Sequence, residues 1–475
     1  MSARKVEPDK ILAGIADYVL QDDVIDDKTV CIAHLAFMDF LGCAFAALDE
    51  PDCQRLIRPL VPGMSVAGGA RIPGTGYELD PAAAAFGFSA LGRWLDYNDS
   101  WFGKGGGGHP SDMFGALLAM GDHLSRKGRG ARAPTMNEVL VAGAKAYEIM
   151  GLHLQMNEFG GFDFTGPLKA ACAAVLTRML GGGFDDIVAA VSQGWVDGQP
   201  LRIVRSPRTG PRKNWASADA ASRAVWLAMK TMDGESGYPE VLTTPVTGLY
   251  DSERNGEPFV FNRSFGSFVM DTIQFKVYPA QFRTQTALEA AITLHPHIGD
   301  RLAEIERVEI ETHERTIHTV DKTGELGGPA DRDHCLQYIV AIGLIFGELR
   351  YSHYGDAVAA DPRVDALRDR MLVRENPEFT RGYQDQSIKT DANAVQIFFT
   401  DGTSTKRVEV LYPMGDPVRR QEVLPVLARK FRENLSGRLP DAKAKALVSL
   451  YDNFDRFSKL PVDRFVDLTI PDGTA

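Results

Sequence analysis

An aspartate and a histidine flank a glycine-rich run in the first quarter of the chain. Asp96 comes before this run and His109 after it, and five of the six residues from 103 to 108 are glycine. Glycine has no side chain to pack and costs extra conformational entropy to order, whereas loops commonly carry functional groups. From these residues alone two interpretations stay open. The run is either a mobile surface loop or a segment that makes room for a ligand beside a carboxylate and an imidazole.

A basic segment occupies the middle of the chain. Five cations fall within residues 202–213 of an otherwise acidic protein, and they are Arg202, Arg205, Arg208, Arg212 and Lys213. A basic loop that leads into a helix suits carboxylate or phosphate recognition, because its side chains donate charge-assisted hydrogen bonds and the helix N-terminus adds positive potential. The alternative is a solvated face whose cations pair with acids elsewhere.

Two later segments hold further titratable groups. Lys276 lies just before a Tyr-Pro pair at a predicted domain junction, and clefts between domains are common ligand sites. Residues 331–335, Asp-Arg-Asp-His-Cys, place His334 at a predicted helix start. Because adjacent residues on a helix do not face each other, we do not expect His334 and Cys335 to act as a thiol–imidazole pair.

The totals describe an ordinary globular chain that is long enough for two domains. It has 475 residues, 44% hydrophobic and 24% charged, and a net charge of −11. The acidic balance argues against a nucleic-acid partner. The longest apolar stretch is interrupted by a histidine and an aspartate, which argues against a membrane partner. The first residues lack the apolar core of a signal peptide, so we expect a cytoplasmic protein.

The five cysteines are scattered and form no Cys-x-x-Cys pair. An odd number of dispersed cysteines suits reduced thiols in a reducing compartment. The spacing offers no zinc site and no ligand cluster for an iron–sulfur centre. The sequence therefore predicts neither of these metal centres.

Helical periodicity dominates the chain up to about residue 232. Apolar residues at three- and four-residue spacing predict helices over 10–20, 28–48, 81–94, 111–124, 135–155, 167–180, 185–194 and 215–232. Ser111 or Asp112 is a candidate N-cap, and Thr135 with Glu138 forms a capping box. Because no alternating strand pattern occurs here, we expect an all-helical bundle.

The pattern changes near residue 270. It predicts helices over 284–294 and 333–349, an alternating strand over 305–312, and a hairpin of strands 394–399 and 407–411 around an Asp-Gly turn. Helices return over 421–435, 441–454 and 462–467. The predicted fold class is mainly α. A large all-helical domain takes residues 1–272 plus 414–475, and a smaller α+β lid domain is inserted over 273–413.

Several stretches together resemble the MmgE/PrpD family, and the similarity runs over nearly the whole chain. They are Leu95–Trp101, Gly108–Asp112, Trp195–Gln199, Gly210–Ala224, Gly237–Pro239, Phe275-Lys276 and Pro329–Tyr338. The resemblance implies the helical domain with its inserted lid, a homodimer, and elimination of water from 2-methylcitrate to give 2-methyl-cis-aconitate in the methylcitrate cycle of propionate catabolism. It implies a hydro-lyase for a small tricarboxylate that needs no metal and no other cofactor.

The family pattern carries over to Asp96, His109, Lys213 and Lys276, with Ser100 where a threonine is usual. Elimination of water needs a base, an acid, and cations that hold carboxylates. We assign catalysis to His109, Asp96 and Lys213, with His109 as base or acid. We assign substrate binding to Lys276, Ser100, Arg212 and His334.

One position departs from the family pattern. Phe164 stands where relatives carry an active-site histidine. Phenylalanine cannot carry a proton, so either His109 does the whole acid–base work or the substrate differs. Three functions therefore stay open: dehydration of 2-methylcitrate, a dehydratase, isomerase or decarboxylase reaction on another carboxylic acid, and a catalytically silent helical dimer that binds an anion or a partner.

Overall fold

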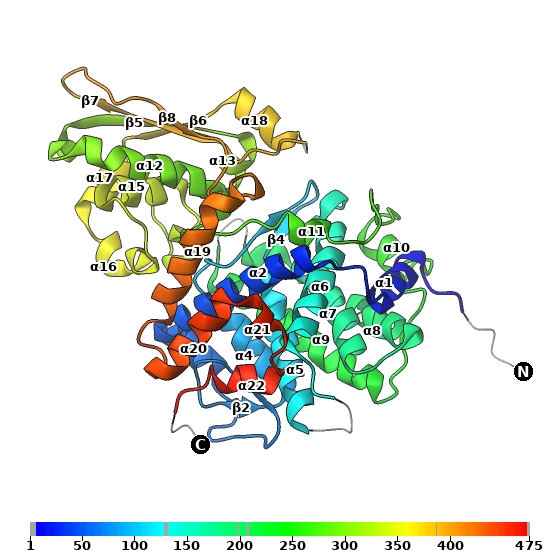
Figure 1. Cartoon of the computed structure of the whole chain (residues 1–475). Helices are drawn as coiled ribbons and strands as arrows, with labels where there is room; N and C mark the ends of the chain where they lie inside the picture. Colours follow the sequence, from blue (N-terminus) through cyan, green and yellow to red (C-terminus); the bar gives the residue numbers. More distant parts are fainter. Residues whose placement is uncertain are drawn as a thin grey trace, which may run out of the picture.

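The computed structural model describes residues 6–127, 132–196, 198, 200–205, 209–385 and 387–472. Helices make up most of the first half of the chain, as the periodicity predicts (Figure 1). They are α1 (Lys10–Leu20), α2 (Asp27–Ala46), α3 (Pro51–Ile57), α4 (Pro81–Arg93), α5 (Phe114–Lys127), α6 (Met136–Met156), α7 (Thr165–Met179), α8 (Phe184–Val196), α9 (Ala216–Met232), α10 (Leu249–Glu253) and α11 (Phe268–Asp271).

Helix caps agree with the sequence at one predicted position and differ at another. The capping box of Thr135 and Glu138 is confirmed at the start of α6. The N-cap predicted at Ser111 or Asp112 is wrong, because both residues lie inside a 3₁₀ helix that precedes α5. The Ser111 hydroxyl instead donates to the Asp99 carboxylate at 2.7 Å.

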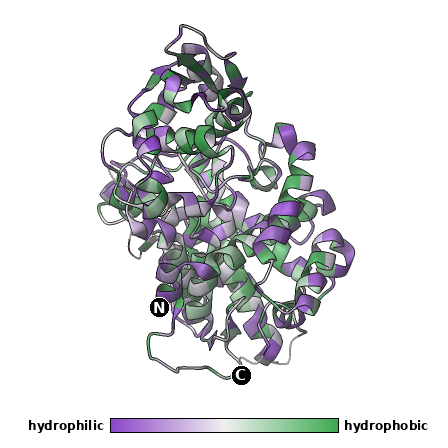
Figure 2. Ribbon diagram, turned by 90° about the vertical axis from the view of Figure 1, so that its left-hand side faces the viewer, coloured by the Kyte–Doolittle hydropathy of each residue, from purple (hydrophilic) through white to green (hydrophobic). Residues whose placement is uncertain are grey.

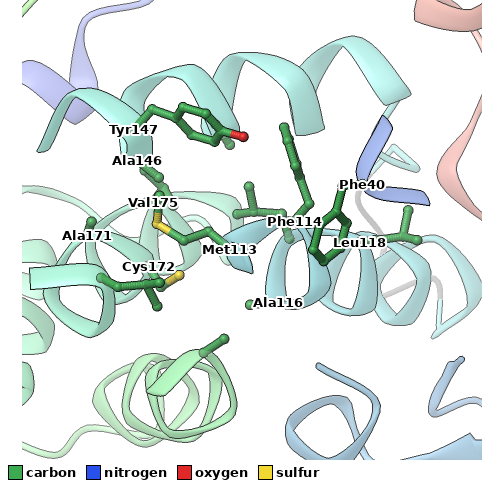
Figure 3. Packing of buried hydrophobic residues seen from close by; sticks show 14 of the residues in the cluster. Phe40, Met113, Phe114, Ala116, Leu118, Ala146, Tyr147, Ala171, Cys172 and Val175 are labelled. Carbon is green, nitrogen blue, oxygen red and sulfur yellow. The ribbon is translucent and has the colours of Figure 1, made fainter. Parts of the chain in front are cut away.

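Helices α2, α4, α5, α6, α7 and α9 contribute side chains to the larger hydrophobic core. Figure 3 shows part of this core, where the ring of Phe114 lies 5.7 Å from that of Tyr147 and 6.3 Å from that of Phe40. The segment Asp27–Asp49 is long and apolar enough to cross a membrane by length and composition alone, but 78% of its apolar window is buried inside the protein. Its apolar sequence is accounted for by this place in the core.

Short strands occur in the part that was expected to be all-helical. β1 (Ala70–Arg71) pairs with β2 (Glu78–Leu79), and β3 (Trp101–Phe102) pairs with β4 (Gly107–Gly108), both antiparallel. Each strand has two residues, too few to produce an alternating pattern. The expectation of a purely helical part is corrected here, and the second pair encloses the glycine-rich run.

A second hydrophobic core lies beside a mixed sheet of order β6–β5–β7–β8. Its strands are β5 (Ile305–Thr312), β6 (Met371–Glu375), β7 (Asn393–Phe399) and β8 (Val408–Val410). The strand at 305–312 and the hairpin of β7 and β8 are confirmed. The sequence pattern missed β6, which runs parallel to β5, because only Met371 among its residues is buried.

Helices cover one side of this sheet, as Figure 1 shows for α12, α15 and α17. The helices between residues 285 and 384 are α12 (Gln285–Ile298), α13 (Glu314–Val320), α14 (Pro329–Arg332), α15 (Leu336–Phe346), α16 (Asp356–Ala359), α17 (Pro362–Arg368) and α18 (Pro377–Gln384). Side chains of α12 and α15 form much of the second core.

The C-terminal end of the chain packs on the larger core. Its helices are α19 (Arg420–Leu435), α20 (Asp441–Asp452), α21 (Phe454–Ser458) and α22 (Val462–Asp467). In Figure 1, α19 starts near the smaller part and runs down beside α2. Figure 2 shows hydrophilic and hydrophobic residues alternating along the outer helices, as amphipathic packing requires. Both ends of the chain thus build one core, while the domain limits at 272/273 and 413/414 stay a prediction.

Candidate active site

A cavity of about 200 Å³ is lined by residues from both parts of the chain, from 93–205 and from 276–334. Among the residues assigned from the sequence, Asp96, His109, Lys276 and His334 line this cavity. The structure therefore brings together four groups that are far apart in the sequence.

Asp96 lies at the centre of the charged groups. Its φ is +49°, a left-handed conformation that strains a non-glycine residue. Its Oδ1 accepts from Arg93 Nη1 and from Lys276 Nζ, both at 2.6 Å, and its Oδ2 lies 3.5 Å from Lys213 Nζ. Burial alone would raise the pKa of Asp96, but the charges of Arg93, Lys276 and Lys213 outweigh it and hold the pKa well below its usual value. Asp96 is therefore an ionised group that orients cations.

His109 presents an unprotonated ring nitrogen toward Asp96. Its Nδ1 lies 2.7 Å from the backbone oxygen of Asp99, and because a carbonyl oxygen only accepts, Nδ1 carries the proton. Burial, followed by the charges of Arg93 and Lys276, lowers the pKa of His109 well below its usual value. The imidazole is neutral at neutral pH, and its Nε2, 3.9 Å from Asp96 Oδ1, can accept a proton.

Residues 99 and 100, just before the glycine-rich run, contact the Nδ1 edge of the His109 ring. Ser100 is fully buried, and its Oγ lies 3.2 Å from His109 Nδ1. The Asp99 carboxylate accepts from the Ser111 backbone N–H and hydroxyl and from the Tyr147 hydroxyl, which fixes the Asp99 carbonyl. Ser100 was assigned to the substrate, but the structure places it against His109, outside the described residues that line the cavity.

The two lysines of the predicted site take different positions. Lys276 lines the cavity, and its Nζ donates to Asp96 Oδ1 at 2.6 Å and to the Asp96 backbone oxygen at 2.9 Å, which leaves a third proton for a ligand. Burial lowers the pKa of Lys276 to about 8. Lys213 is fully buried and donates to both carboxylate oxygens of Asp333, at 2.8 and 2.7 Å. In the part of the chain that the structure describes, Lys213 does not reach the cavity wall.

His334 lines the cavity and is held by Asp333. Its Nδ1 lies 2.5 Å from Asp333 Oδ1, and burial together with the charge of Lys213 lowers the pKa of His334 to about 4. Ligand atoms of Asp96, Asp333 and His334 lie within 4.8 Å of one another, a grouping that could hold a metal ion. Lys213 Nζ, however, already lies 2.7 Å from Asp333 Oδ2 and 3.3 Å from His334 Nδ1. Since an ammonium and a divalent cation repel strongly at such distances, this donor set fits the lysine.

Arg93 is a cavity residue that the sequence analysis missed. It ends α4, three residues before Asp96, and is fully buried. Its Nε and Nη2 have no hydrogen-bond partner among the described residues, with Asp112 Oδ2 at 3.8 Å from Nε. Because Arg93 also lines the cavity, its guanidinium places a positive charge at the wall, where it can attract a carboxylate. The available signal in the sequence was its three-residue spacing from Asp96, typical of a pair on one helical face.

Further arginines raise the positive potential of the cavity. Arg202 and Arg205 of the basic segment line it, as do Arg283 and Arg315 from the other part of the chain. Burial, and after it the charge of Arg315, lowers the pKa of Arg202. Such mutual repulsion is relieved when an anion binds. Part of the basic segment therefore reaches the cavity, as the anion-binding interpretation requires, while anion binding itself stays a prediction.

Arg212 of the basic segment follows the alternative. Arg212 was assigned to the substrate, but its Nη2 donates to Asp219 at 2.8 Å on the surface, and its guanidinium lies 4.0 Å from the Trp215 ring centroid. The structure thus does not bring Arg212 to the cavity. Arg208 lies outside the described residues.

The glycine-rich run is packed against the end of α6. The backbone N–H groups of Lys104 and Gly105 donate to the Gln155 carbonyl at 2.9 and 3.3 Å. A Cβ on Gly103 would lie 2.4 Å from Cα of Gln155, and a Cβ on Gly107 would lie 1.9 Å from the Phe102 ring. Although these glycines have no side chain to pack, their absence of a Cβ lets the backbone of the run approach the end of α6 closely.

Phe164 lies beside His109, with their rings edge to face and their centroids 5.8 Å apart. The guanidinium of Arg205 lies 4.5 Å from the Phe164 ring centroid while its Nε donates to Asp163 at 2.5 Å. A Cβ on Gly108 would lie 2.5 Å from the same ring. Phe164 is thus held in place at the cavity wall.

Comparison with protein-family models gives two matches that together span most of the chain. Residues 13–262 match the MmgE/PrpD N-terminal domain, and residues 278–455 match the MmgE/PrpD C-terminal domain. The cavity is lined from both matched regions, and Lys276 lies in the short stretch between them.

Relatives that match over nearly the whole chain share one named activity. The chain is 45% identical over 473 residues to the 2-methylcitrate dehydratase of Escherichia coli (strain K12), covering 98% of each chain. It is 44% identical to the enzyme of that name from Cupriavidus necator, again covering 98% of each. It is 39% identical to the mitochondrial 2-methylcitrate dehydratase of Yarrowia lipolytica, over 97% of this chain and 90% of that one.

Proposed function

Because this chain belongs to the MmgE/PrpD family, we propose that it is a hydro-lyase that eliminates water from 2-methylcitrate to give 2-methyl-cis-aconitate. One observation carries the proposal. A neutral His109, whose Nε2 is available, and a protonated Lys276 line the same arginine-rich cavity. These groups supply the base, the acid and the anion-binding charge that the reaction needs.

His109 is the base in this proposal. The new double bond of 2-methyl-cis-aconitate includes the carbon that carries the methyl group, so this carbon loses the proton. His109 Nε2 takes it, and the electrons of the C–H bond form the double bond. The imidazolium that results lies 3.9 Å from the Asp96 carboxylate, which stabilises its charge.

Lys276 is the acid. The hydroxyl on the neighbouring carbon leaves with its bonding electrons and takes a proton from Lys276 Nζ, so that water is released. Full burial brings the pKa of Lys276 to about 8, closer to neutral pH than an ordinary lysine, and general acids work best there. The proton gained by His109 and the proton lost by Lys276 balance over the reaction.

The substrate carboxylates are bound by the arginines of the cavity. Arg93 lines the cavity beside Asp96, and Arg202, Arg205 and Arg283 add positive charge to its wall. Lys213, which was assigned to catalysis, is a positioning residue in the proposal, because it holds Asp96 and Asp333 in place without reaching the cavity. Such a site needs no metal, since protein cations neutralise the developing charge. We extend the proposal to a homodimer in the cytoplasm, with the lid closing over the substrate.

The test is a direct absorbance assay for the enoate double bond, whose absorbance should rise when 2-methylcitrate or citrate loses water and fall if cis-aconitate is hydrated. We expect product from 2-methylcitrate and a loss of about 10²- to 10⁴-fold in kcat/KM for His109→Ala, the usual weight of a general base. His297→Ala, at an exposed histidine outside the cavity, is the matched control.

Near-wild-type turnover of the His109 variant would remove His109 from the mechanism. Product from another acid, with none from 2-methylcitrate, would favour a related enzyme, a possibility that Phe164 keeps open. Tight tricarboxylate binding without any product would identify a silent binding protein.

A further inference from the structure

Phe164 is the apolar group that packs directly against the His109 ring. Its side chain is 8% exposed, and its ring meets the imidazole edge to face at 5.8 Å between centroids. The guanidinium of Arg205 lies 4.5 Å from the Phe164 ring centroid. Gly108 lies so close to the ring that a side chain at position 108 would collide with it. The ring therefore has little freedom to turn away from the cavity.

The reaction itself fixes where the alkyl group of the substrate lies. In 2-methylcitrate the methyl group is bonded to the carbon whose proton His109 removes. The methyl carbon is thus one bond away from the reacting carbon and close to the imidazole. On its Asp96 side, the imidazole faces ionised groups, because Arg93 and Lys276 both bind Asp96. Phe164 is an apolar group of the cavity wall that contacts the imidazole ring.

We propose that Phe164 is the specificity-determining residue that contacts the alkyl substituent, so that the enzyme selects 2-alkylcitrates over citrate. This inference rests on the proposed function. A methyl group packed against an aromatic ring is removed from water, which favours a substrate that carries the methyl group over one that lacks it. One methylene in a hydrophobic pocket discriminates by roughly 10- to 200-fold in kcat/KM.

The experiment compares citrate, 2-methylcitrate and 2-ethylcitrate as substrates of the full-length protein, measured as kcat/KM by enoate absorbance. The variants are Phe164→Ala, which opens space, and Phe164→Leu, which keeps an apolar side chain and protects the test against a folding failure. Phe265→Leu is the matched control, because Phe265 is half-buried against Tyr18, away from the cavity.

We expect the wild type to prefer 2-methylcitrate over citrate by about 10-fold or more. Phe164→Ala should lower this ratio about 10-fold and raise the ratio of 2-ethylcitrate to 2-methylcitrate by a similar factor. Phe164→Leu should change both ratios in the same direction by a smaller factor, and the control should change neither.

Equal effects of the Phe164 variants on all three substrates would overturn the inference while leaving the dehydratase function standing. A wild type that produces no enoate from any of the three would overturn the proposed function, and the inference with it. The two failures are thus told apart by the wild-type data alone.

Discussion

Lys276 is a fully buried lysine whose ammonium binds the Asp96 carboxylate. Because burial lowers the pKa of Lys276 to about 8, the protonated acid is present below that pH and lost above it. We expect kcat/KM on 2-methylcitrate, which reports the free enzyme, to fall about tenfold per pH unit above roughly pH 8. The measurement is a pH–rate profile from pH 6.5 to 10.

The matched variant for this profile is Lys276→Arg. An arginine stays protonated throughout the range. We therefore expect Lys276→Arg to have a lower kcat/KM than the wild type but to show no decline at alkaline pH. If kcat/KM of Lys276→Arg still declines near pH 8, the decline belongs to the titration of another group.

The cluster of Asp96, Asp333 and His334 gives a prediction about metals. Lys213 Nζ lies 2.7 Å from Asp333 Oδ2, 3.3 Å from His334 Nδ1 and 3.5 Å from Asp96 Oδ2, so an ammonium already contacts all three members of the cluster. We therefore expect incubation with excess chelator, followed by desalting, to leave kcat/KM unchanged. Lost activity that a divalent ion restores would contradict the role given to Lys213.

At the scale of single elements, the glycine-rich run depends on close backbone packing. Gly103→Ala would place a Cβ 2.4 Å from Cα of Gln155 on α6. Overpacking of this kind costs roughly 1–3 kcal/mol, so we expect a lower free energy of unfolding in urea. Gly161→Ala is the control, because a Cβ there meets nothing within 4 Å. If both variants have the same free energy of unfolding, the backbone of the glycine-rich run can shift to accept a Cβ at little cost, and the prediction is wrong.

The elements predicted best from the sequence were those with a long, regular pattern of apolar residues. The helix at 10–20 and the strand at 305–312 have the predicted limits, because one face of each is buried. Strand β6 was not predictable, since it has a single buried residue and depends on its neighbour β5.

The site divides in the same way. Asp96, His109 and Lys276 belong to motifs that resemble a known family. Arg93 lies in an alanine-rich helix, and the sequence gives no sign of which of its N–H groups lack a partner. Only the folded structure shows that Nε and Nη2 have no hydrogen-bond partner among the described residues. Arg212 was indistinguishable from Arg205 by charge alone, because only the path of the loop decides which one turns inward.

At the scale of the whole molecule, Lys430 ties the C-terminal helices to the site. Its Nζ forms an ion pair with Asp39 at 2.8 Å and donates to the backbone oxygens of Tyr97 and Lys276 at 2.8 and 2.9 Å. Lys430→Met leaves Asp39 charged and buried, which costs about 3–5 kcal/mol. We expect this loss in urea unfolding, and lower kcat because the backbone around Asp96 loses support.

The double variant Asp39→Asn with Lys430→Met should recover part of the stability, since no charge is left unpaired. Arg432→Ala, at an exposed pair with Asp452, is the control and should change the free energy of unfolding by no more than about 0.5 kcal/mol. A Lys430 variant as stable as the control would contradict the role of this ion pair.

The arginines around the cavity also have a consequence for how a substrate arrives. The protein carries a net charge of −11, so its distant field repels a tricarboxylate. That field fades over a Debye length of about 8 Å at physiological ionic strength, whereas Arg202, Arg205, Arg283 and Arg315 act at the cavity itself. Capture is then decided only by the last few ångströms of the approach, and moderate salt should slow the encounter far less than it does for enzymes that attract their substrates from afar.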